Sequence, residues 1–550
     1  MLKNILLFST IIILFIRCDY KKKYSKLKLS PNLIDQSEKR EVFSEEELRS
    51  WYAKDIEFDT VPGISLYRAN DSLLKNREGE DVVIAFLDSE IDINHEVLED
   101  IIWENVKETP NNGIDDDDNG YIDDVNGWNF LGNMNGENNS FTSYEFTRFL
   151  KKYDSFFKEK KAEEVGSKDS ILYETFIRAQ KKYKERVEYA KEDIEYANML
   201  STSMFNVKKE LAKYFLNRDY TLKDLDSLKE AFPDNKELQR VILIRTNFIK
   251  YGFTQNYINN YKLNAEERVK KLLNLSFNDR KITKDNPDDI NDFSYGNKFV
   301  NKNINLFEHG TELAGVIANF KNKKLKIMPV CISPFGDEHD KDIALAIRYA
   351  VDNGAKVINM SFGKEFSLHT EWVFSAFKYA EKNNVLIISS AGNSKFNLNI
   401  VNDYYPNDNI DNGKEISDNF VLVGAISKKL GKKFLYRDTN YGNIDVDLFA
   451  PGQEIYTAVP NNKYKMDNGT SLSAAITSGV AALIYSYYPN LTASQIKHIL
   501  MDSGLEYTFE VSTPTKEDKN KTTPFNQLSK SGKVLNAYNA LIMADSISRN

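Results

Sequence analysis

Three short strings, far apart in the sequence, carry an Asp, a His and a Ser that could act together. Asp88 ends the apolar run 82–87, His309 opens the string His-Gly-Thr-Glu-Leu-Ala-Gly, and Ser471 follows Gly-Thr. A serine hydroxyl is a weak nucleophile, which a histidine activates as a general base while a carboxylate orients that histidine. These residue types therefore predict a hydrolase that attacks a carbonyl group through Ser471 and forms an acyl-enzyme.

The surroundings of Ser471 favour the same chemistry. Ser471 opens the stretch 471–485, which is rich in small and apolar residues and predicts a buried helix with the serine at its N-terminus. Backbone N–H groups and the helix dipole stabilise negative charge there, as an oxyanion requires. Asn393 follows the apolar run 385–390, and its side chain could supply a further donor. We expect Asn393 to complete an oxyanion hole.

Largely unbroken apolar runs predict the elements that position these residues. Such runs are typical of strands buried on both faces, as in a parallel sheet. They cover residues 81–88, 325–332, 355–360, 385–390 and 420–426. Helical patterns at 341–353 and 368–384 alternate with them, which predicts an α/β sandwich. Chemistry in such folds gathers at the carboxyl ends of strands, and both Asp88 and Asn393 lie there.

Together these strings resemble the subtilisin-like serine proteases, the subtilase family, over residues 82–130 and 300–545. The order Asp, His, Ser along the chain is that of subtilisin. The resemblance implies a three-layer sandwich with a mostly parallel sheet, a triad of Asp88, His309 and Ser471, and Asn393 as oxyanion donor. It also implies that the walls of the substrate-binding cleft are Ser361, Phe362, Gly363, Ser390, Ala391 and Gly392.

Three residues depart from the family pattern without removing a member of the triad. Glu90 stands where a Gly is usual, Glu312 replaces a common second His, and Ala475 replaces a frequent Pro. Glu90 places a second negative charge near Asp88. We expect this charge to raise the pKa of His309 and to shift the activity optimum to higher pH.

Residues 133–280 predict a helical insertion within the sequence that resembles a peptidase. This segment is rich in Lys, Glu, Tyr and Leu, and apolar residues recur at helical spacing over 170–200. The peptidase domain would then consist of 81–132 and 281–545, and the insertion has the size of a small domain. Two interpretations remain open: a self-packed, solvated lobe, or a lid or exosite over the substrate cleft.

An acidic string after the first strand follows the spacing of a calcium-binding loop. The expected ligands are Asp115, Asp117, Asn119, the carbonyl group of Tyr121, and Asp123. The last position of the loop is Asn126 instead of the usual Glu, so we expect modest affinity for a structural Ca²⁺. The alternative is a solvated acidic turn. Catalysis itself needs no cofactor.

The N-terminus predicts export. Lys3 precedes a mostly apolar run at 5–16, which is too short to span a bilayer comfortably and is typical of a secretory signal. Cys18 directly afterwards resembles the lipidated residue of a bacterial lipoprotein, which implies a signal at 1–18, a tether and lead-in segment at 19–80, and a membrane-anchored protein of the cell envelope. An ordinary export signal or a single membrane anchor is the alternative.

The composition of the 550 residues limits the remaining possibilities. Hydrophobic residues make up 41% and charged residues 28%, which predicts a packed core. The net charge of −8 gives no reason to expect nucleic-acid binding. Cys331 lies in an apolar run and should be a buried structural thiol. We expect a monomer that acts on protein or peptide substrates.

Two alternatives to an active enzyme stay open. One is a catalytically inactive lipoprotein of the same fold that binds peptides through its cleft. The other is a surface protein that binds a partner through the helical insertion.

Overall fold

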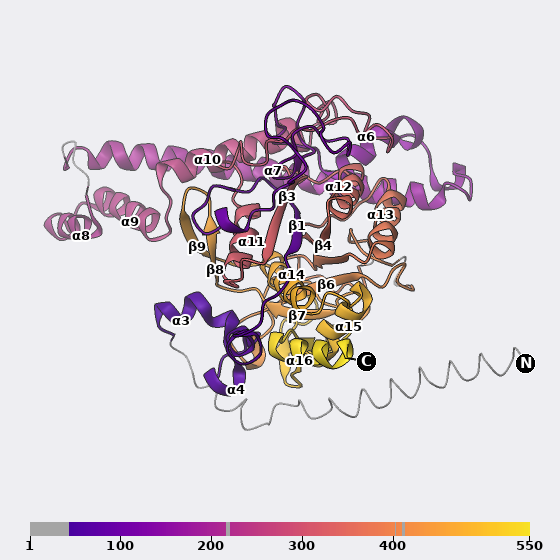
Figure 1. Cartoon of the computed structure of the whole chain (residues 1–550). Helices are drawn as coiled ribbons and strands as arrows, with labels where there is room; N and C mark the ends of the chain where they lie inside the picture. The colour runs from indigo at the N-terminus through magenta and orange to yellow at the C-terminus, as the bar shows by residue number, and fades with distance from the viewer. Residues whose placement is uncertain (1–42, 216–219, 402, 410–412, 550) are drawn as a thin grey trace, which may run out of the picture. The chain divides into compact units, whose positions relative to one another are not determined.

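A computed structural model describes residues 43–215, 220–401, 403–409 and 413–549 (Figure 1). The chain divides into two compact units. One, here called the sheet unit, runs up to Ser140 and resumes at Arg280; the other, the helical unit, is Phe141–Asp279. The predicted signal and Cys18 lie outside the described residues. Within the described ranges, no helix is both long and apolar enough to cross a membrane.

The sheet unit is built on nine strands in the order β10-β13-β7-β6-β5-β4-β1-β3-β2. In chain order they are β1 (Val82–Asp88), β2 (Trp128–Asn129), β3 (Leu325–Cys331), β4 (Ala355–Met360), β5 (Leu386–Ser390), β6 (Phe420–Ile426), β7 (Leu448–Pro451), β10 (Leu505–Glu506) and β13 (Lys533–Val534). Neighbouring strands are parallel except for β10 and β13. The predicted α/β fold with a mostly parallel sheet is confirmed.

Both faces of this sheet are buried, because successive side chains of a strand point to opposite sides. Ile84 and Phe86 belong to one hydrophobic core, while Ala85 and Leu87 belong to the other. Helices contribute to the first core from α11 (His309–Ala318), α14 (Thr470–Tyr487), α15 (Ala493–Asp502) and α16 (Ala537–Ser548), and to the second from α12 (Asp340–Asp352) and α13 (Thr370–Lys382). These are the three layers of the sandwich (Figure 1).

The lead-in segment before β1 is part of the first core. It forms α3 (Glu45–Ser50), η1 (Trp51–Ala53), α4 (Ile56–Asp59), α5 (Leu66–Ala69) and η2 (Asn70–Leu74). Trp51, Ile64 and Leu66 are fully buried in the core that also contains α14. The backbone N–H of Ala537 donates to the carbonyl oxygen of Ile64 at 2.7 Å, which attaches this segment to the start of α16.

The helical unit contains α6 (Glu145–Phe157), η4 (Ala162–Glu164), α7 (Ser170–Leu211), α8 (Leu222–Ala231), α9 (Lys236–Lys250), α10 (Gln255–Glu267) and η5 (Arg268–Leu272). The long helix α7 covers the stretch where apolar residues recur at helical spacing. Leu200 and Met204 of α7 pack with Phe248 of α9 and Ile258 of α10. The unit therefore has hydrophobic contacts of its own.

A buried ion-pair network stabilises the chain where it re-enters the sheet unit. Arg280 lies 2.7 Å from both Asp285 and Asp342, and Lys341 lies 2.7 Å from Asp285. Burial alone would raise the pKa of Asp285, but hydrogen bonds and charges from Arg280 and Lys341 lower it to about 2. The acidic stretch 285–292 thus starts with a carboxylate that pairs with basic side chains.

Smaller elements complete the sheet unit. They are η3 (Glu99–Ile101), η6 (Gly431–Lys433), η7 (Phe525–Gln527), the hairpin of β8 (Ile455–Val459) and β9 (Lys463–Asp467), and the pair β11 (Glu510–Ser512) and β12 (Thr522–Pro524). Cys331, at the end of β3, is buried, as its apolar surroundings predicted.

Candidate active site

Asp88 and His309 are in direct contact. Nδ1 of His309 lies 2.9 Å from Oδ1 and 3.0 Å from Oδ2 of Asp88. Asp88 is the last residue of β1, His309 is the first of α11, and the next residue lets the two elements approach closely. A Cβ atom placed on Gly310 would lie 2.6 Å from the carbonyl oxygen of Ser89, closer than a side chain tolerates. With Nδ1–H donating to Asp88, a neutral His309 presents the lone pair of Nε2 as a base.

The charges around His309 favour its protonated form. Burial lowers the pKa of His309, but the charge and hydrogen bond of Asp88, together with the charges of Glu312 and Asp467, raise it to about 9. The side chain is 44% exposed, so solvent screens part of this attraction. The base therefore becomes neutral at a higher pH than an ordinary histidine.

Glu312 and Asp467 form a charged group with one lysine beside the imidazole ring. The ammonium group of Lys465 lies 2.5 Å from Glu312 and 3.0 Å from Asp467. Burial raises the pKa of Glu312 to about 7. Glu90, which we expected to act on His309, accepts hydrogen bonds from the side chains of Asn129, Asn138 and Asn303. Glu312, which also departs from the family pattern, is among the charges that raise the pKa of His309.

Ser471 lies in the first turn of α14, a helix buried along most of its length. Its hydroxyl group donates to the carbonyl oxygen of Ser361 at 3.2 Å. A serine has a single hydroxyl proton, so the side chain must turn from this carbonyl to Nε2 of His309 before it can be deprotonated. Catalytic hydrogen bonds often form only when substrate is present.

Asn393 and the backbone of Ser471 face the same small space. Oδ1 of Asn393 accepts from the backbone N–H of Thr470 at 3.0 Å and from its hydroxyl at 3.2 Å. This orients the amide so that Nδ2 can donate elsewhere. A Cβ atom placed on Gly469 would lie 3.4 Å from Nδ2 of Asn393 and 3.8 Å from N of Ser471. Gly469, with φ +154°, keeps this space open for a substrate oxygen.

Gly363 and Gly392, two of the residues expected in the cleft walls, lie on either side of a residue that the motifs did not indicate. A Cβ atom placed on Gly363 would lie 2.4 Å from the hydroxyl oxygen of Tyr404, and one placed on Gly392 would lie 2.0 Å from the same atom. The Tyr404 hydroxyl thus touches both walls. No signal in the sequence pointed to Tyr404, because it lies outside every motif and reaches the cleft from a loop.

A cavity of about 240 Å³ opens beside the Asp88–His309 pair. Ser361 and Phe362 from the end of β4 contribute to its lining, as does Phe335. Phe335 stacks on Phe307, another lining residue, with ring centroids 5.0 Å apart. An apolar side chain of a bound peptide could be accommodated next to the histidine.

The acidic loop after β1 brings three carboxylates together. Ligand oxygens of Glu108, Asp115 and Asp117 lie within 4.8 Å of one another. Oδ1 of Asp117 is buried and has no hydrogen-bond partner among the described residues. Three carboxylates with an unpaired buried oxygen fit a hard cation such as Ca²⁺, which prefers oxygen ligands. Glu108 lies outside the twelve-residue loop pattern, so the sequence did not indicate it.

The other expected ligands have different contacts. Asp123 lies 2.8 Å from the ammonium group of Lys298. The side chain of Asn119 donates to Asp124 and accepts from the backbone of Tyr121. The ligand predicted at Tyr121 is its carbonyl group, while its ring packs edge-on against Trp128 with centroids 5.1 Å apart. The cluster of three carboxylates from Glu108, Asp115 and Asp117 therefore differs in its residues from the predicted loop site.

Comparison with known proteins agrees with this architecture. The chain belongs to the subtilase family, whose profile matches residues 79–529. It is 27% identical to subtilisin-like protease 1 of Plasmodium falciparum (isolate 3D7) over 319 residues, covering 53% of this chain and 45% of that protein. It is 32% identical to the cell wall-associated protease of Bacillus subtilis (strain 168) over 228 residues, covering 39% of this chain and 23% of that protein. The chain thus spans less than half the length of either relative.

One solved structure is a cold-adapted subtilisin-like serine proteinase, at 26% sequence identity and a TM-score of 0.32. The match covers 42% of this chain and 74% of that structure.

Proposed function

We propose that this protein is a serine endopeptidase that hydrolyses peptide bonds in proteins through an acyl-enzyme on Ser471. The observation that carries the proposal is the contact of Nδ1 of His309 with both carboxylate oxygens of Asp88, at 2.9 and 3.0 Å. It supports a general base whose Nε2 is unprotonated when the ring is neutral.

Each step then uses a residue of this chain. Nε2 of His309 takes the proton of Ser471 as its oxygen attacks the peptide carbonyl, and the resulting oxyanion accepts hydrogen bonds from N of Ser471 and Nδ2 of Asn393. The imidazolium, stabilised by Asp88, then protonates the leaving amine. Water then enters, gives a proton to Nε2 of His309 and attacks the ester carbonyl. His309 returns this proton to the oxygen of Ser471 as the ester bond breaks, which releases the acid and restores the free enzyme.

Two further properties belong to the same proposal. The enzyme is exported and held at the membrane of the cell envelope by a lipid on Cys18, supported by the signal-like sequence before that residue. A Ca²⁺ ion held by Glu108, Asp115 and Asp117 cross-links the loop after β1, supported by the buried, unpaired oxygen of Asp117. When bound, the ion supplies charge that offsets carboxylate repulsion, and it takes no part in peptide hydrolysis.

Digestion of a denatured protein such as casein tests the activity directly. We expect internal cleavages by the wild type, identified by mass spectrometry, and none by Ser471→Ala protein prepared in the same way. If the folded wild type cleaves no more than the Ser471→Ala variant, the endopeptidase proposal is wrong and the alternative of an inactive, peptide-binding protein stands. Incorporation of a radiolabelled fatty acid into the wild type but not into Cys18→Ser protein tests the anchor.

A further inference from the structure

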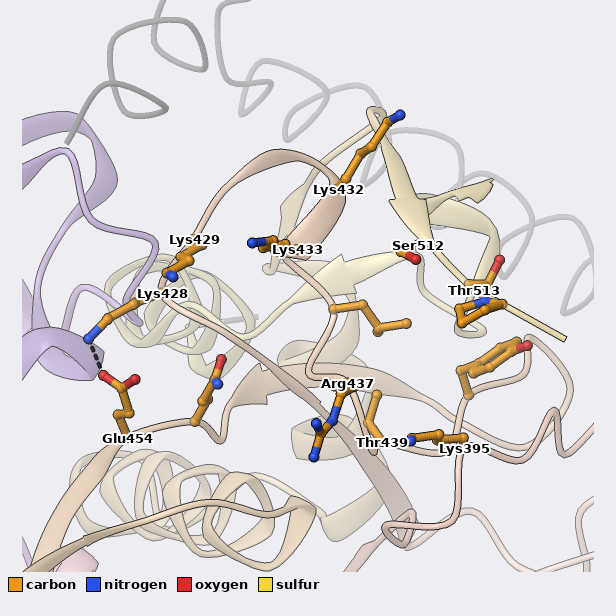
Figure 2. Close-up of a pocket in the computed structure, with 14 residues that line it drawn as sticks. Lys395, Lys428, Lys429, Lys432, Lys433, Arg437, Thr439, Glu454, Ser512 and Thr513 are labelled. Carbon is orange, nitrogen blue, oxygen red and sulfur yellow. Dashed lines mark hydrogen bonds and ion pairs between the residues drawn. The ribbon is translucent and has the colours of Figure 1, made fainter. Parts of the chain in front are cut away.

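Six basic side chains contribute to the lining of a cavity of about 420 Å³ in the sheet unit (Figure 2). This basic basin consists of Lys395, Lys428, Lys429, Lys432, Lys433 and Arg437. Figure 2 shows Lys395 and Arg437 on one side and Lys429 and Lys433 on the facing loop. Since the whole chain carries a net charge of −8, this concentration of positive charge is a local feature.

Acidic neighbours neutralise only part of the basin. Lys428 pairs with Glu454, and Asp438 lies 3.1 Å from both Lys395 and Arg437. The other three lysines, at positions 429, 432 and 433, are exposed and have no ion-pair partner in the part of the chain that the structure describes. Six positive charges against two negative ones leave an excess that a bound anion would relieve.

The loop that carries four of these lysines is firmly held. The buried hydroxyl of Ser427 donates to the carbonyl oxygen of Lys433 at 2.7 Å, and the backbone N–H of Ser427 donates to the carbonyl oxygen of Phe434 at 2.7 Å. Phe434 is fully buried and lies 4.9 Å from Phe525, measured between ring centroids. A fixed loop loses little conformational entropy when it binds a ligand.

The basin adjoins the loop of the oxyanion donor. Lys395 follows Asn393 by two residues, so their Cα atoms are at most about 8 Å apart. The backbone N–H of Lys395 donates to the carbonyl oxygen of Asp438 at 3.0 Å, which joins this loop to the segment that carries Arg437. An extended peptide advances about 3.3 Å per residue, so a few residues separate the reacting carbonyl from the basin.

We propose that the basic basin binds an acidic segment of the peptide substrate, with two or more Asp or Glu side chains a few residues from the scissile bond. This inference rests on the proposed function, because it assumes that the peptide runs past Asn393. The charge complementarity and the volume favour carboxylates over a single small anion.

Binding to Ser471→Ala protein tests the basin without requiring catalysis. The probe is a fluorescent peptide with three Glu residues, and its partner has Gln at the same positions; affinity is measured by anisotropy at low salt. We expect the Glu peptide to bind about 10-fold more tightly, with the difference shrinking as salt increases. The double change Lys432→Glu and Lys433→Glu should abolish the preference.

The matched control places the same two charge changes elsewhere, as Lys378→Glu and Lys382→Glu on α13, where both lysines are exposed. This control should keep the preference for Glu. Equal affinities for both peptides, or an equal loss in the control, would overturn the proposal. A third outcome would also overturn the proposal: the basin variant loses binding to vesicles containing phosphatidylserine but keeps its preference for the Glu peptide. The basin would then bind a membrane and not the substrate. Failure of the proposed function appears separately, as wild-type protein that does not cleave casein.

A different observation, the position of Tyr404, carries a second inference. Its hydroxyl touches Gly363 and Gly392, the glycines of the two cleft walls, and its ring packs against the same core as Phe362. The loop is tied to one wall, because the backbone groups of Lys364 and Tyr405 exchange two hydrogen bonds, each of 2.8 Å. The Tyr404 hydroxyl thus occupies the space between these two glycines.

We infer that Tyr404 restricts the substrate residue on the acyl side of the scissile bond to Gly, Ala or another small side chain. To test this restriction, kcat/KM is measured for two peptides that differ only in the residue on the acyl side of the scissile bond, which is Ala in one and Phe in the other. The wild type should prefer Ala, and Tyr404→Gly should change the Phe/Ala ratio about 100-fold in favour of Phe. Tyr404→Phe, which keeps the ring, and Tyr405→Phe are the controls and should keep the Ala preference.

A wild-type preference for Phe, or an unchanged ratio in folded Tyr404→Gly protein, would overturn this second inference. The Ala and Phe peptides can also be compared without turnover. Their affinities are then measured for Ser471→Ala protein and for protein that carries both Ser471→Ala and Tyr404→Gly. An inactive enzyme would therefore not hide the result.

Discussion

Nδ1 of His309 contacts the carboxylate of Asp88 although 221 positions separate the two residues in the chain. The contact exists because β1 ends where α11 begins, with Gly310 against the backbone of Ser89. The helical unit lies between them in sequence, and the chain re-enters the sheet unit at Arg280, which pairs with buried carboxylates. The helical unit therefore lengthens the connection in sequence, while Asp88 and His309 both belong to the sheet unit.

Replacing Asp88 by Asn should lower kcat by about 10⁴-fold at neutral pH, because the imidazole loses the partner that fixes its tautomer and stabilises its charge. KM and the thermal transition should change little. Kinetics on a peptide substrate check this, with Asp100→Asn, an exposed position of the same unit, as the matched control. A loss of less than tenfold would argue against Asp88 as the orienting carboxylate.

The pH dependence of kcat/KM should follow the ionisation of His309. The base must be neutral to take a proton, and its pKa is raised to about 9, so activity should rise with pH and level off only above that value. Glu312→Gln removes a nearby negative charge, lowers the pKa of His309 and should shift the rising limb to lower pH. Glu90→Gln should leave the limb in place. The reverse pattern would restore Glu90 as the residue that acts on His309.

Asn393→Ala should reduce kcat by about 10²–10³-fold, the cost known for a side-chain oxyanion donor in a subtilisin, with little effect on KM. The reason is that Nδ2 would bind the oxyanion more strongly than the ground-state carbonyl. Single-turnover acylation rates give the measurement. A rise in KM at constant kcat would assign Asn393 to substrate binding instead.

Calcium should stabilise the protein through the loop after β1. Differential scanning calorimetry should show a lower Tm after treatment with a chelator and recovery on adding Ca²⁺, equivalent to about 2.7 kcal/mol when the ion is at 100 times its Kd. Asp117→Asn should remove the response, whereas Asp118→Asn, at an exposed neighbouring position, should keep it. Equal Ca²⁺ responses in both variants would place the ion elsewhere.

Local sequence was sufficient for the strands and for the residues at their ends. The runs at β1, β3 and β4 are largely apolar because both faces of the sheet are covered, and that pattern is readable without tertiary information. Asp88 and Asn393 could be placed because a polar residue at or shortly after the end of such a run lies at the carboxyl edge of the sheet.

Residues whose role depends on distant contacts could not be predicted in this way. Tyr404 reaches Gly363 and Gly392 from a loop whose neighbouring residue Tyr405 pairs with Lys364, and nothing in its own sequence neighbourhood indicates this. The group of Glu312, Lys465 and Asp467 joins α11 to β9, which are about 150 positions apart in sequence. We expected a charge effect on His309 from Glu90, because Glu90 follows Asp88 by two residues, and not from Glu312, although Glu312 lies only three residues after His309.

Labelling with a fluorophosphonate probe tests the central claim most directly, because the probe reacts with an activated serine and needs no knowledge of the substrate. The account predicts stoichiometric modification of Ser471, located by peptide mass spectrometry, in the folded wild type. Labelling should be abolished by heat unfolding and by Ser471→Ala, and slowed by His309→Ala. Folded wild-type protein that stays unlabelled at Ser471, or is labelled equally fast without His309, would contradict the account.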